Sequence, residues 1–299
     1  MTAGFAIPFQ RHQGTWSTRL FTVLFFTVLL ALCGPARSQA IAGPNPEPSS
    51  QPSLDLLPDA PQPPAAPQPQ SADPAQPISK PAVTLRTVPI DIVKDEAAIW
   101  TSPIRVRERN FPILIPLVLA TTLAITTDHQ AMNSSKLQNA SLNSHANTAS
   151  NGLLGGFVIA PVAIYGIGYL HHDSHATETG ILAGEAMVHS LVVDEVLKAV
   201  TMRERPTLDN AQGKFFQSSV GLDSSFPSTH SIIAWSSATV IASEYPGPLT
   251  QITAYGLATG VSLTRVLAKQ HFPSDVLVGS AVGWMIGRYI VHKHHRDDY

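Results

Sequence analysis

Three short clusters of basic, hydroxyl and imidazole side chains occur in order in the second half of the chain. They are Lys198-Ala-Val-Thr-Met-Arg-Glu-Arg205-Pro206, then Phe226-Pro-Ser-Thr-His-Ser231, then Thr264-Arg-Val-Leu-Ala-Lys-Gln-His-Phe-Pro-Ser-Asp275. Together they supply cations, two histidines and a carboxylate. Transfer of a phosphoryl group needs cations to hold its oxygens, a nucleophile and an acid, and it can proceed without a metal when side chains supply the charge. The clusters therefore predict phosphoryl-transfer chemistry.

The first two clusters have the groups of an anion site. Lys198 and Arg205 are seven residues apart, which is about two helical turns, so we expect both to point the same way from the end of one helix. Ser228 has the position of an N-cap before an apolar helix, so the N–H groups of Thr229 and His230 are expected to face an anion. His230 is placed to give a proton to the leaving oxygen. Each cluster alone also fits a structural role, as a solvated helix end or a simple N-cap.

The third cluster places a histidine beside a carboxylate. Pro273 is a natural first residue of a helix, so His271 is expected just before the helix and Asp275 in its first turn, close enough to orient the imidazole. Such a pair leaves one ring nitrogen free to attack phosphorus, although a helix-capping pair is the structural alternative. Arg265, at the end of the preceding helix, is expected to supply a third cation.

The three clusters resemble the signature of the type 2 phosphatidic acid phosphatase (PAP2) superfamily, which includes acid phosphatases, lipid phosphatases and vanadium haloperoxidases. The family pattern is Lys-x6-Arg-Pro, Pro-Ser-Gly-His and Ser-Arg-x5-His-x3-Asp, and every spacing is met between Thr101 and His292. Thr229 replaces the glycine and Thr264 the serine, which affects the shape of the pocket more than its chemistry.

The resemblance implies a metal-independent acid phosphatase without a cofactor, acting on a lipid phosphate, a pyrophosphate or a soluble phosphate ester. It implies that His271 is the nucleophile and forms a phosphohistidine, with His230 and Asp275 as the other catalytic residues. The phosphate-binding residues would be Lys198, Arg205, Ser228, Thr229 and Arg265, and no metal ligand is expected. Two alternatives are a vanadate-dependent haloperoxidase, which would hold vanadate in the same pocket, and a non-catalytic envelope protein.

Helical periodicity without strand-like alternation predicts an all-α bundle of about six core helices. A short amphipathic helix over Asp91–Trp100 should precede them, and a mobile Ser/Asn-rich loop is expected over Asn133–Asn151. The loop histidines His171, His172 and His175 and the tail histidines show no recognised metal-ligand spacing. The expected core helices span residues 112–127, 152–170, 176–202, 229–244, 249–268 and 273–292.

The N-terminal third has the composition of an export signal and a linker. Residues 1–40 contain Arg11, Arg19 and Arg37 but no acid, an apolar run, and small residues before Ile41, which is typical of a secretory signal peptide. Residues 41–85 are rich in Pro, Gln and Ser, which predicts a disordered linker before a phosphatase domain over 86–299. Cys33, the only cysteine of the chain, lies in the signal, so no disulfide or thiolate metal site is expected in the mature chain.

Export predicts a periplasmic or cell-envelope protein, soluble or membrane-associated. Only 13% of the residues are charged, and the mature chain is net acidic, which argues against nucleic acid as a partner. The acids and bases of the segment 181–202 and the shortness of 112–127 and 229–244 argue against an integral membrane protein. The arginines of 105–109 also argue against an integral membrane protein. They would lie on the outer side of the membrane if all six helices crossed it, whereas arginine favours the cytoplasmic side. We therefore favour a bundle that touches a membrane surface without fully crossing it.

Overall fold

The computed structural model describes residues 88–295, apart from the side chains of residues 103 and 104. The predicted signal peptide and linker lie outside these residues. The regular structure of the described chain is helical, so the all-α prediction is confirmed. The α-helices are α2 (Val88–Thr101), α3 (Phe111–Met132), α4 (Ala140–His171), α5 (Ser174–Thr201), α6 (Thr229–Glu244), α7 (Pro248–Leu267) and α8 (Pro273–His294).

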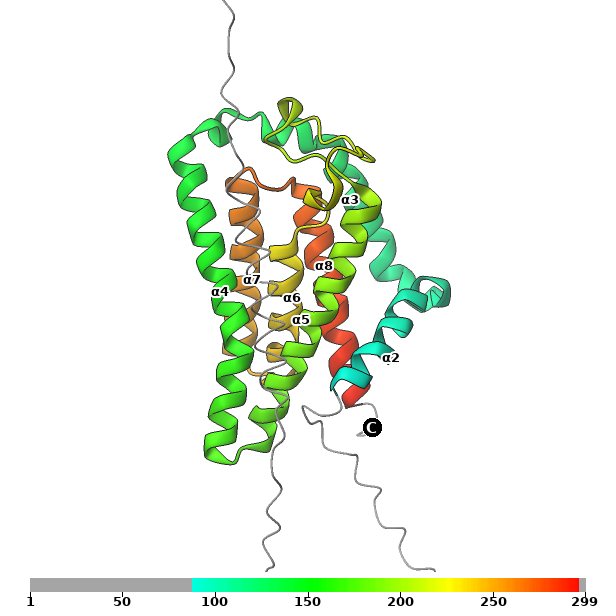
Figure 1. Cartoon of the computed structure of the whole chain (residues 1–299), viewed down its shortest axis with the longest axis vertical. Coiled ribbons are helices and arrows are strands. Elements are labelled where there is room, and N and C mark those ends of the chain that lie inside the picture. The colour runs from blue at the N-terminus through cyan, green and yellow to red at the C-terminus, as the bar shows by residue number, and fades with distance from the viewer. Residues whose placement is uncertain (1–87, 296–299) are drawn as a thin grey trace, which may run out of the picture.

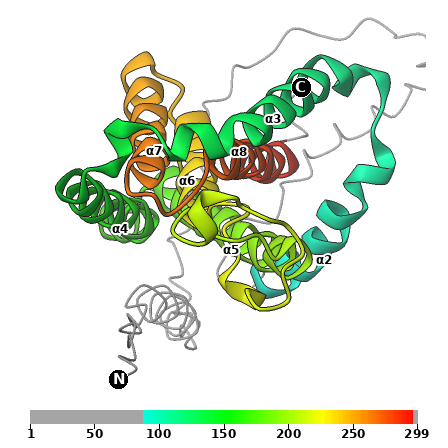
Figure 2. The same ribbon diagram turned by 90° about the horizontal axis from the view of Figure 1, so that it is seen from above.

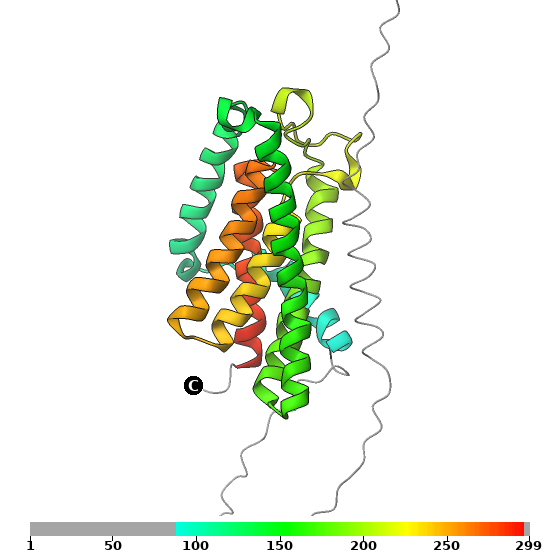
Figure 3. The same cartoon turned by 90° about the vertical axis from the view of Figure 1, so that its left-hand side faces the viewer.

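Five long helices form the bundle, and α6 lies at its centre (Figure 1). Seen from above, α4, α5, α7 and α8 surround α6, while α3 lies on the outer side and contacts α8 (Figure 2). The helix α4 extends along the whole length of the bundle (Figure 3). The chain reverses at each connection, so α3, α5 and α7 end where α4, α6 and α8 begin. We call this the upper end, after its place in Figure 1.

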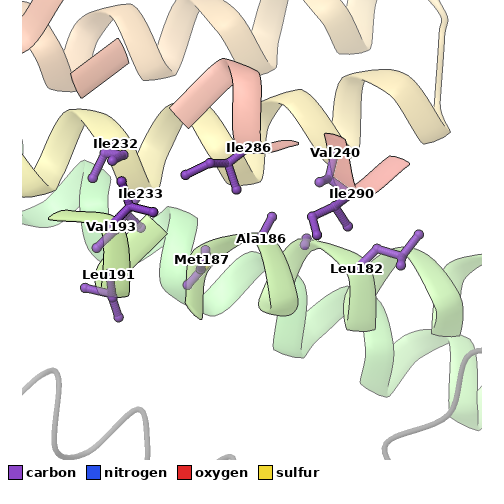
Figure 4. Packing of buried hydrophobic residues seen from close by; sticks show 11 residues of the cluster. Leu182, Ala186, Met187, Leu191, Val193, Ile232, Ile233, Val240, Ile286 and Ile290 are labelled. Atoms are coloured by element: carbon purple, nitrogen blue, oxygen red, sulfur yellow. The ribbon is translucent and has the colours of Figure 1, made fainter. Parts of the chain in front are cut away.

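Two apolar clusters hold the bundle together. The larger one joins α5, α6 and α8, with Leu182, Ile232 and Ile290 fully buried (Figure 4). The second joins α4, α6 and α7 and consists mostly of alanines around Phe157 and Val261. Burial of one such aliphatic side chain contributes about 1.5–3 kcal/mol. The two clusters therefore hold α4, α5, α7 and α8 against the central helix α6.

Three glycines bring α8 directly against the backbone of α6. A Cβ at Gly279 would lie 2.9 Å from the carbonyl oxygen of Ser228, and one at Gly287 would lie 2.7 Å from that of Ser236. A Cβ at Gly283 would come closer still to the carbonyl oxygen of Ile232. Any side chain at these positions would separate the helices, so the glycines fix the distance between α6 and α8.

The Ser/Asn-rich segment is not a loop, which corrects our expectation. Most of it belongs to α4, which begins at Ala140, twelve residues before the predicted start, and Ser135–Gln138 forms a 3-10 turn. The side chain of Asn139 accepts a hydrogen bond from the N–H of Leu142 at 3.1 Å and caps the helix. Polar residues of low helix propensity are thus helical here because a capped start and contacts with the bundle override propensity.

Two segments of the described chain, Glu108–Met132 and Ala140–His171, are long and apolar enough to cross a membrane, judged by length and composition. The apolar side chains of α3 are unusually exposed, among them Val118 at 61% and Leu123 at 66%. The acids and bases that argued against spanning are mostly buried, because Glu185, His189, Asp194 and Lys198 face the bundle interior and only Glu195 is exposed. The ground drawn from the acids and bases therefore does not hold, and the ground drawn from length holds only for α6, which has 16 residues.

Candidate active site

The start of α6 carries the second motif. Ser228 is the N-cap, and its side chain accepts from the N–H of Ser231, as predicted. Thr229 donates its hydroxyl to Asp194 Oδ2 at 2.8 Å and accepts a short hydrogen bond from Lys198 Nζ. Lys198 also pairs with Asp194 Oδ2 at 2.8 Å. The threonine in the glycine position of the family pattern therefore ties the site lysine to the helix start.

Arg205 does not lie on the helix that carries Lys198, which corrects our spacing argument. The helix α5 ends at Thr201, and Met202 adopts a left-handed conformation with φ 40°. Arg205 follows in the loop, where its guanidinium donates to Asp223 Oδ1 at 3.1 Å and to the carbonyl oxygen of Gln270 at 3.1 Å. The two cations reach the same site because the chain turns back over the upper end, not because they share a helix face.

His271 lies in the loop before α8 and is held by a main-chain carbonyl. Its Nδ1 lies 2.7 Å from the carbonyl oxygen of Ser225, which can only accept a hydrogen bond, so Nδ1 carries the proton. The nearest oxygen of Asp275 is 3.7 Å from Nδ1, too far for a hydrogen bond. The other nitrogen, Nε2, therefore keeps the lone pair. The oriented imidazole that we predicted is present, but Ser225 orients it directly.

Asp275 instead organises the loop around the histidine. It lies in the first turn of α8, as predicted, and accepts from the N–H of Phe272 at 2.8 Å. Its other oxygen pairs with Arg203 Nη1 at 2.5 Å. Arg203 Nη2 pairs in turn with Asp128 Oδ2 of α3 at 2.7 Å, and all these groups are buried. Asp275 is thus a positioning residue for His271.

The sequence reasoning missed Arg203 and Asp128. Arg203 is 2% exposed and lies between two aromatic rings, 4.1 Å from the centroid of Phe272 and 4.6 Å from that of Phe215. The position of Arg203 inside the first motif could have indicated a role in the site. For Asp128 the sequence offers one indication, that it is the single carboxylate of an otherwise apolar helix. Such a residue is expected to have a buried partner.

Two asparagines of α4 complete the site, and we missed both because they fall in the segment read as a loop. Asn151 Oδ1 is 2.9 Å from His230 Nε2, and Asn147 Oδ1 accepts from Arg265 Nη1 at 2.9 Å. Arg265 is 6% exposed, and its buried Nε has no hydrogen-bond partner in the described part of the chain. A buried guanidinium with a spare donor is suited to an anionic ligand.

The charges converge on His271. Burial is the main cause that lowers the pKa of His271 well below 6.5, and the positive charges of Arg205, Arg265 and Lys198 lower it further. The same three cations surround His230. The structure therefore brings Lys198, Arg205, Arg265, His230 and His271 to one place, although they come from three helices and two loops. The main-chain N–H of Ser228 also joins α6 to the carbonyl of Asp275 at 3.1 Å.

This arrangement can hold a tetrahedral oxyanion against a neutral imidazole. Three cations and the N-terminus of α6 favour negative charge, and Nε2 of His271 keeps a lone pair for attack on phosphorus. His230, with Nε2 bound to Asn151, has Nδ1 left for proton exchange.

Residues 179–299 match the PAP2 superfamily. The resemblance drawn from the three motifs is confirmed over these residues, which contain all three clusters. The match begins later than Thr101, so α2, α3 and α4 lie before it.

Two similar proteins carry related descriptions. A lipid A 1-phosphatase from Porphyromonas gingivalis is 35% identical over 65 residues, which are 21% of this chain and 15% of that protein. This chain therefore spans 15% of the length of that curated relative. A transmembrane PAP2-type phosphatidylglycerolphosphate phosphatase from Bacillus subtilis has a solved structure that matches with a TM-score of 0.44 and 18% identity, covering 71% of this chain and 98% of that one.

Proposed function

We propose, given that residues 179–299 match the PAP2 superfamily, that this chain is a membrane-bound lipid-phosphate phosphatase that works through a phosphohistidine on His271. One observation carries the mechanism. His271 is buried, its Nδ1–H donates to a main-chain carbonyl, and three cations surround it, of which Arg265 has an N–H without a partner among the described residues. A nucleophile kept neutral among cations is suited to attack on a phosphate ester.

In the first step, Nε2 of His271 attacks phosphorus, and the N–P bond forms as the bond to the ester oxygen breaks. His230, protonated on both ring nitrogens while the phosphate ester is bound, gives its Nδ1 proton to that oxygen, so an alcohol leaves instead of an alkoxide. Lys198, Arg205 and Arg265 hold the non-bridging oxygens as their charge changes. Nδ1 of His271 keeps its proton and donates it to the carbonyl oxygen of Ser225, which stabilises the positive charge that develops on the ring.

In the second step, a water molecule attacks the phosphohistidine. His230, now neutral, takes a proton from the water as the O–P bond forms and the N–P bond breaks. Inorganic phosphate leaves, His271 is neutral again and His230 is protonated again. No step needs a metal, because side chains supply the positive charge.

The outer helices support a membrane location for this chemistry. The segment Glu108–Met132 is apolar, and none of its most apolar window is buried. A large exposed apolar surface on one helix is unfavourable in water and favourable in a bilayer. We propose that α3 and α4 cross the membrane and that the bundle is embedded with them.

An apolar groove supports a substrate with an acyl chain. It lies between α4, α6 and α7, has a volume of about 520 Å³, and is lined by side chains that include Leu153, Phe157 and Leu257. Its α4 wall begins at Gly152, the residue after the Asn151 that binds His230. An acyl chain in this groove would place the attached phosphate near the upper end of the bundle.

Export of the mature chain to the periplasm or cell envelope is part of the proposal and rests on the composition of residues 1–40. Sequencing of the mature N-terminus tests it, since cleavage should leave Ile41 first. A protein that begins at Met1 would contradict cleavage and leave the phosphatase proposal intact.

The experiment that tests the mechanism is quenching with alkaline SDS during turnover of a ³²P-labelled lipid phosphate by the detergent-solubilised full chain. The wild-type protein should carry acid-labile label, and His271→Ala should carry none and lose hydrolysis altogether. Lys214→Gln, an exposed cation at the same end, should label normally as a control. An active His271→Ala variant would overturn the mechanism.

The same preparation tests metal independence and the haloperoxidase alternative. Hydrolysis assayed well below the unfolding temperature should persist in EDTA, because the three cations replace a metal. Loss of activity that added Mg²⁺ restores would contradict this. Halide oxidation with vanadate and peroxide, without phosphate-ester hydrolysis, would favour the haloperoxidase.

A further inference from the structure

A second cluster of ionisable side chains lies at the end of the bundle opposite the active site. Asp95 of α2, Glu185 and His189 of α5 are all buried, and one possible ligand atom of each lies within 4.8 Å of the others. The imidazole of His294, near the end of α8, lies with Nε2 3.7 Å from Glu185 Oε2. These groups come from three helices. His189 and Lys198 are nine residues apart, so about 14 Å of α5 separates this cluster from the active site.

The central groups of the cluster lack hydrogen-bond partners among the described residues. Glu185 is 2% exposed, and neither of its carboxylate oxygens has a hydrogen-bond partner. His189 is fully buried, and its Nε2 likewise has none. Leaving a buried carboxylate and a buried ring nitrogen unsatisfied is costly, so native proteins almost always provide each with a hydrogen-bond partner, a water molecule or an ion.

The orientation of His189 fits a metal ligand. Its Nδ1 lies 2.7 Å from Glu96 Oε1, so a proton on Nδ1 is donated to that carboxylate. In the neutral ring Nε2 carries the lone pair, and it faces Glu185 Oε1 and Asp95 Oδ2, each 3.8 Å away. A histidine that donates one N–H to a carboxylate and offers its other nitrogen is the usual arrangement around a protein-bound metal.

The distances fit a small divalent cation. Ligand atoms about 2.0–2.2 Å from a tetrahedral ion lie about 3.3–3.6 Å apart. Three of the separations are 3.7 and 3.8 Å and exceed this range by a few tenths of an ångström. The ligand atoms of Asp95, Glu185 and His189 all lie within 4.8 Å of one another, so binding of one ion would draw them together by at most about 1.5 Å. Mixed imidazole and carboxylate ligands suit Zn²⁺ and neighbouring transition metals better than Mg²⁺ or Ca²⁺.

The local charge favours the same ion. Three carboxylates, of Asp95, Glu96 and Glu185, lie around His189. The cation Lys293 pairs with Asp95, with Nζ 2.8 Å from Oδ2 and 2.6 Å from Oδ1. Tyr289 adds a neutral donor to the same oxygen at 3.0 Å. With both histidines neutral, the group carries a net charge of −2, and one divalent cation makes it neutral.

We propose that Asp95, Glu185, His189 and His294 bind one Zn²⁺ ion that fastens α2 and the end of α8 to α5. The site is structural and separate from the phosphate chemistry. It leaves Glu96 as the residue that orients His189.

Zinc binding to the chelator-treated full chain in detergent tests this proposal, measured by titration calorimetry and by metal analysis after gel filtration. We expect one Zn²⁺ per chain and a higher unfolding temperature with zinc. Co²⁺ in place of Zn²⁺ should give the visible absorption of a tetrahedral site. Glu185→Gln should weaken zinc binding at least 100-fold, and Glu96→Gln should weaken it 10- to 100-fold through the orientation of His189.

Two further variants keep the test decisive. Glu178→Gln on the same helix, away from the cluster, should bind zinc like the wild type. His294→Gln changes a ligand close to the chain end, so it tests the site even where Glu185→Gln does not fold. Zinc binding that is absent in the wild type, or equal in the wild type, Glu185→Gln and His294→Gln, would overturn the proposal, and the pair His189–Glu96 would then be a proton-shared ion pair.

Discussion

The proton affinity of His271 decides the pH range in which the proposed phosphatase would work. Burial lowers its pKa well below 6.5, and Arg205, Arg265 and Lys198 lower it further. The neutral, nucleophilic form therefore persists below pH 6.5. We expect kcat at saturating substrate to be retained as the pH falls through 6.5 and to be lost only at lower pH.

Arg205→Gln tests whether the positive charge of one cation lowers the pKa of His271. Without that cation the pKa of His271 rises, so the acidic limb of the kcat profile should move to higher pH. Lys214→Gln should leave the limb where it is. Equal profiles for wild type and Arg205→Gln would mean that another group sets the limb.

The free energy of unfolding, like kcat, should decrease as the pH falls. An unfolded His271 has a pKa of about 6.5, so below that pH the unfolded state binds more protons than the folded state. The free energy of unfolding contributed by this residue is present above pH 6.5 and decreases as the pH falls.

The assignment of His230 as an acid predicts a dependence on the leaving group. An aliphatic alkoxide needs a proton to leave, whereas p-nitrophenolate does not. His230→Ala should therefore lose about 10²- to 10⁴-fold in rate on an alkyl phosphate and far less on p-nitrophenyl phosphate. Asn151→Ala should show a weaker version of the same pattern, since Asn151 holds the ring. Equal losses on both esters would assign His230 to phosphate binding instead.

Residue types and spacings predicted the members of the site but not all of their contacts. Ser228 as a cap, Pro273 as a helix start and Asp275 in the first turn followed from local rules, and the structure has them. The partner of His271 could not be predicted in this way. It is the main-chain carbonyl of Ser225, 46 residues away, and every residue has such a carbonyl whatever its type.

At the scale of elements, the α4 wall of the groove offers a test of the substrate. A Cβ at Gly156 meets nothing within 4 Å, so Gly156→Leu should fold and fill part of the groove. Hydrolysis of a long-chain lipid phosphate should fall by at least tenfold in kcat/KM, while p-nitrophenyl phosphate should be cleaved as before. Gly155→Leu is the matched control, because it is equally open and does not line the groove. Equal lipid kinetics for both variants would place the acyl chain elsewhere.

The helices themselves were predictable where apolar periodicity was strong. The predicted bounds of α6, 229–244, agree with the structure, and those of α7 and α8 differ by at most two residues. The start of α4 was wrong because Asn and Ser favour loops in isolation, and a long-range contact such as Asn147 to Arg265 cannot be read from propensity. The position of Arg205 was wrong because helical spacing assumes that the helix continues.

At the scale of the molecule, the exposed apolar surface of α3 predicts an integral membrane protein. The protein should remain in the membrane pellet after extraction with alkaline carbonate and should need detergent for release. Val118→Arg places a charge on that surface, at a cost of about 2.5–3.5 kcal/mol near the middle of a spanning helix, and should lower the amount recovered in the membrane. Arg107→Lys, outside the helix, should not. Release of the wild type by carbonate would return us to a bundle that only touches the membrane.

The glycine contacts between α6 and α8 limit how far the proposed site would have to rearrange when substrate binds. Ser228 and the helix that follows His271 are joined through backbone atoms, with Gly279, Gly283 and Gly287 leaving no side chain that could rearrange between them. The phosphate cradle and the nucleophile therefore need no reorganisation when substrate arrives, and little entropy is lost in assembling them. We therefore expect substrates to be distinguished by the part that lies beyond the phosphate, while the phosphate itself meets Ser228 and His271 at a fixed separation.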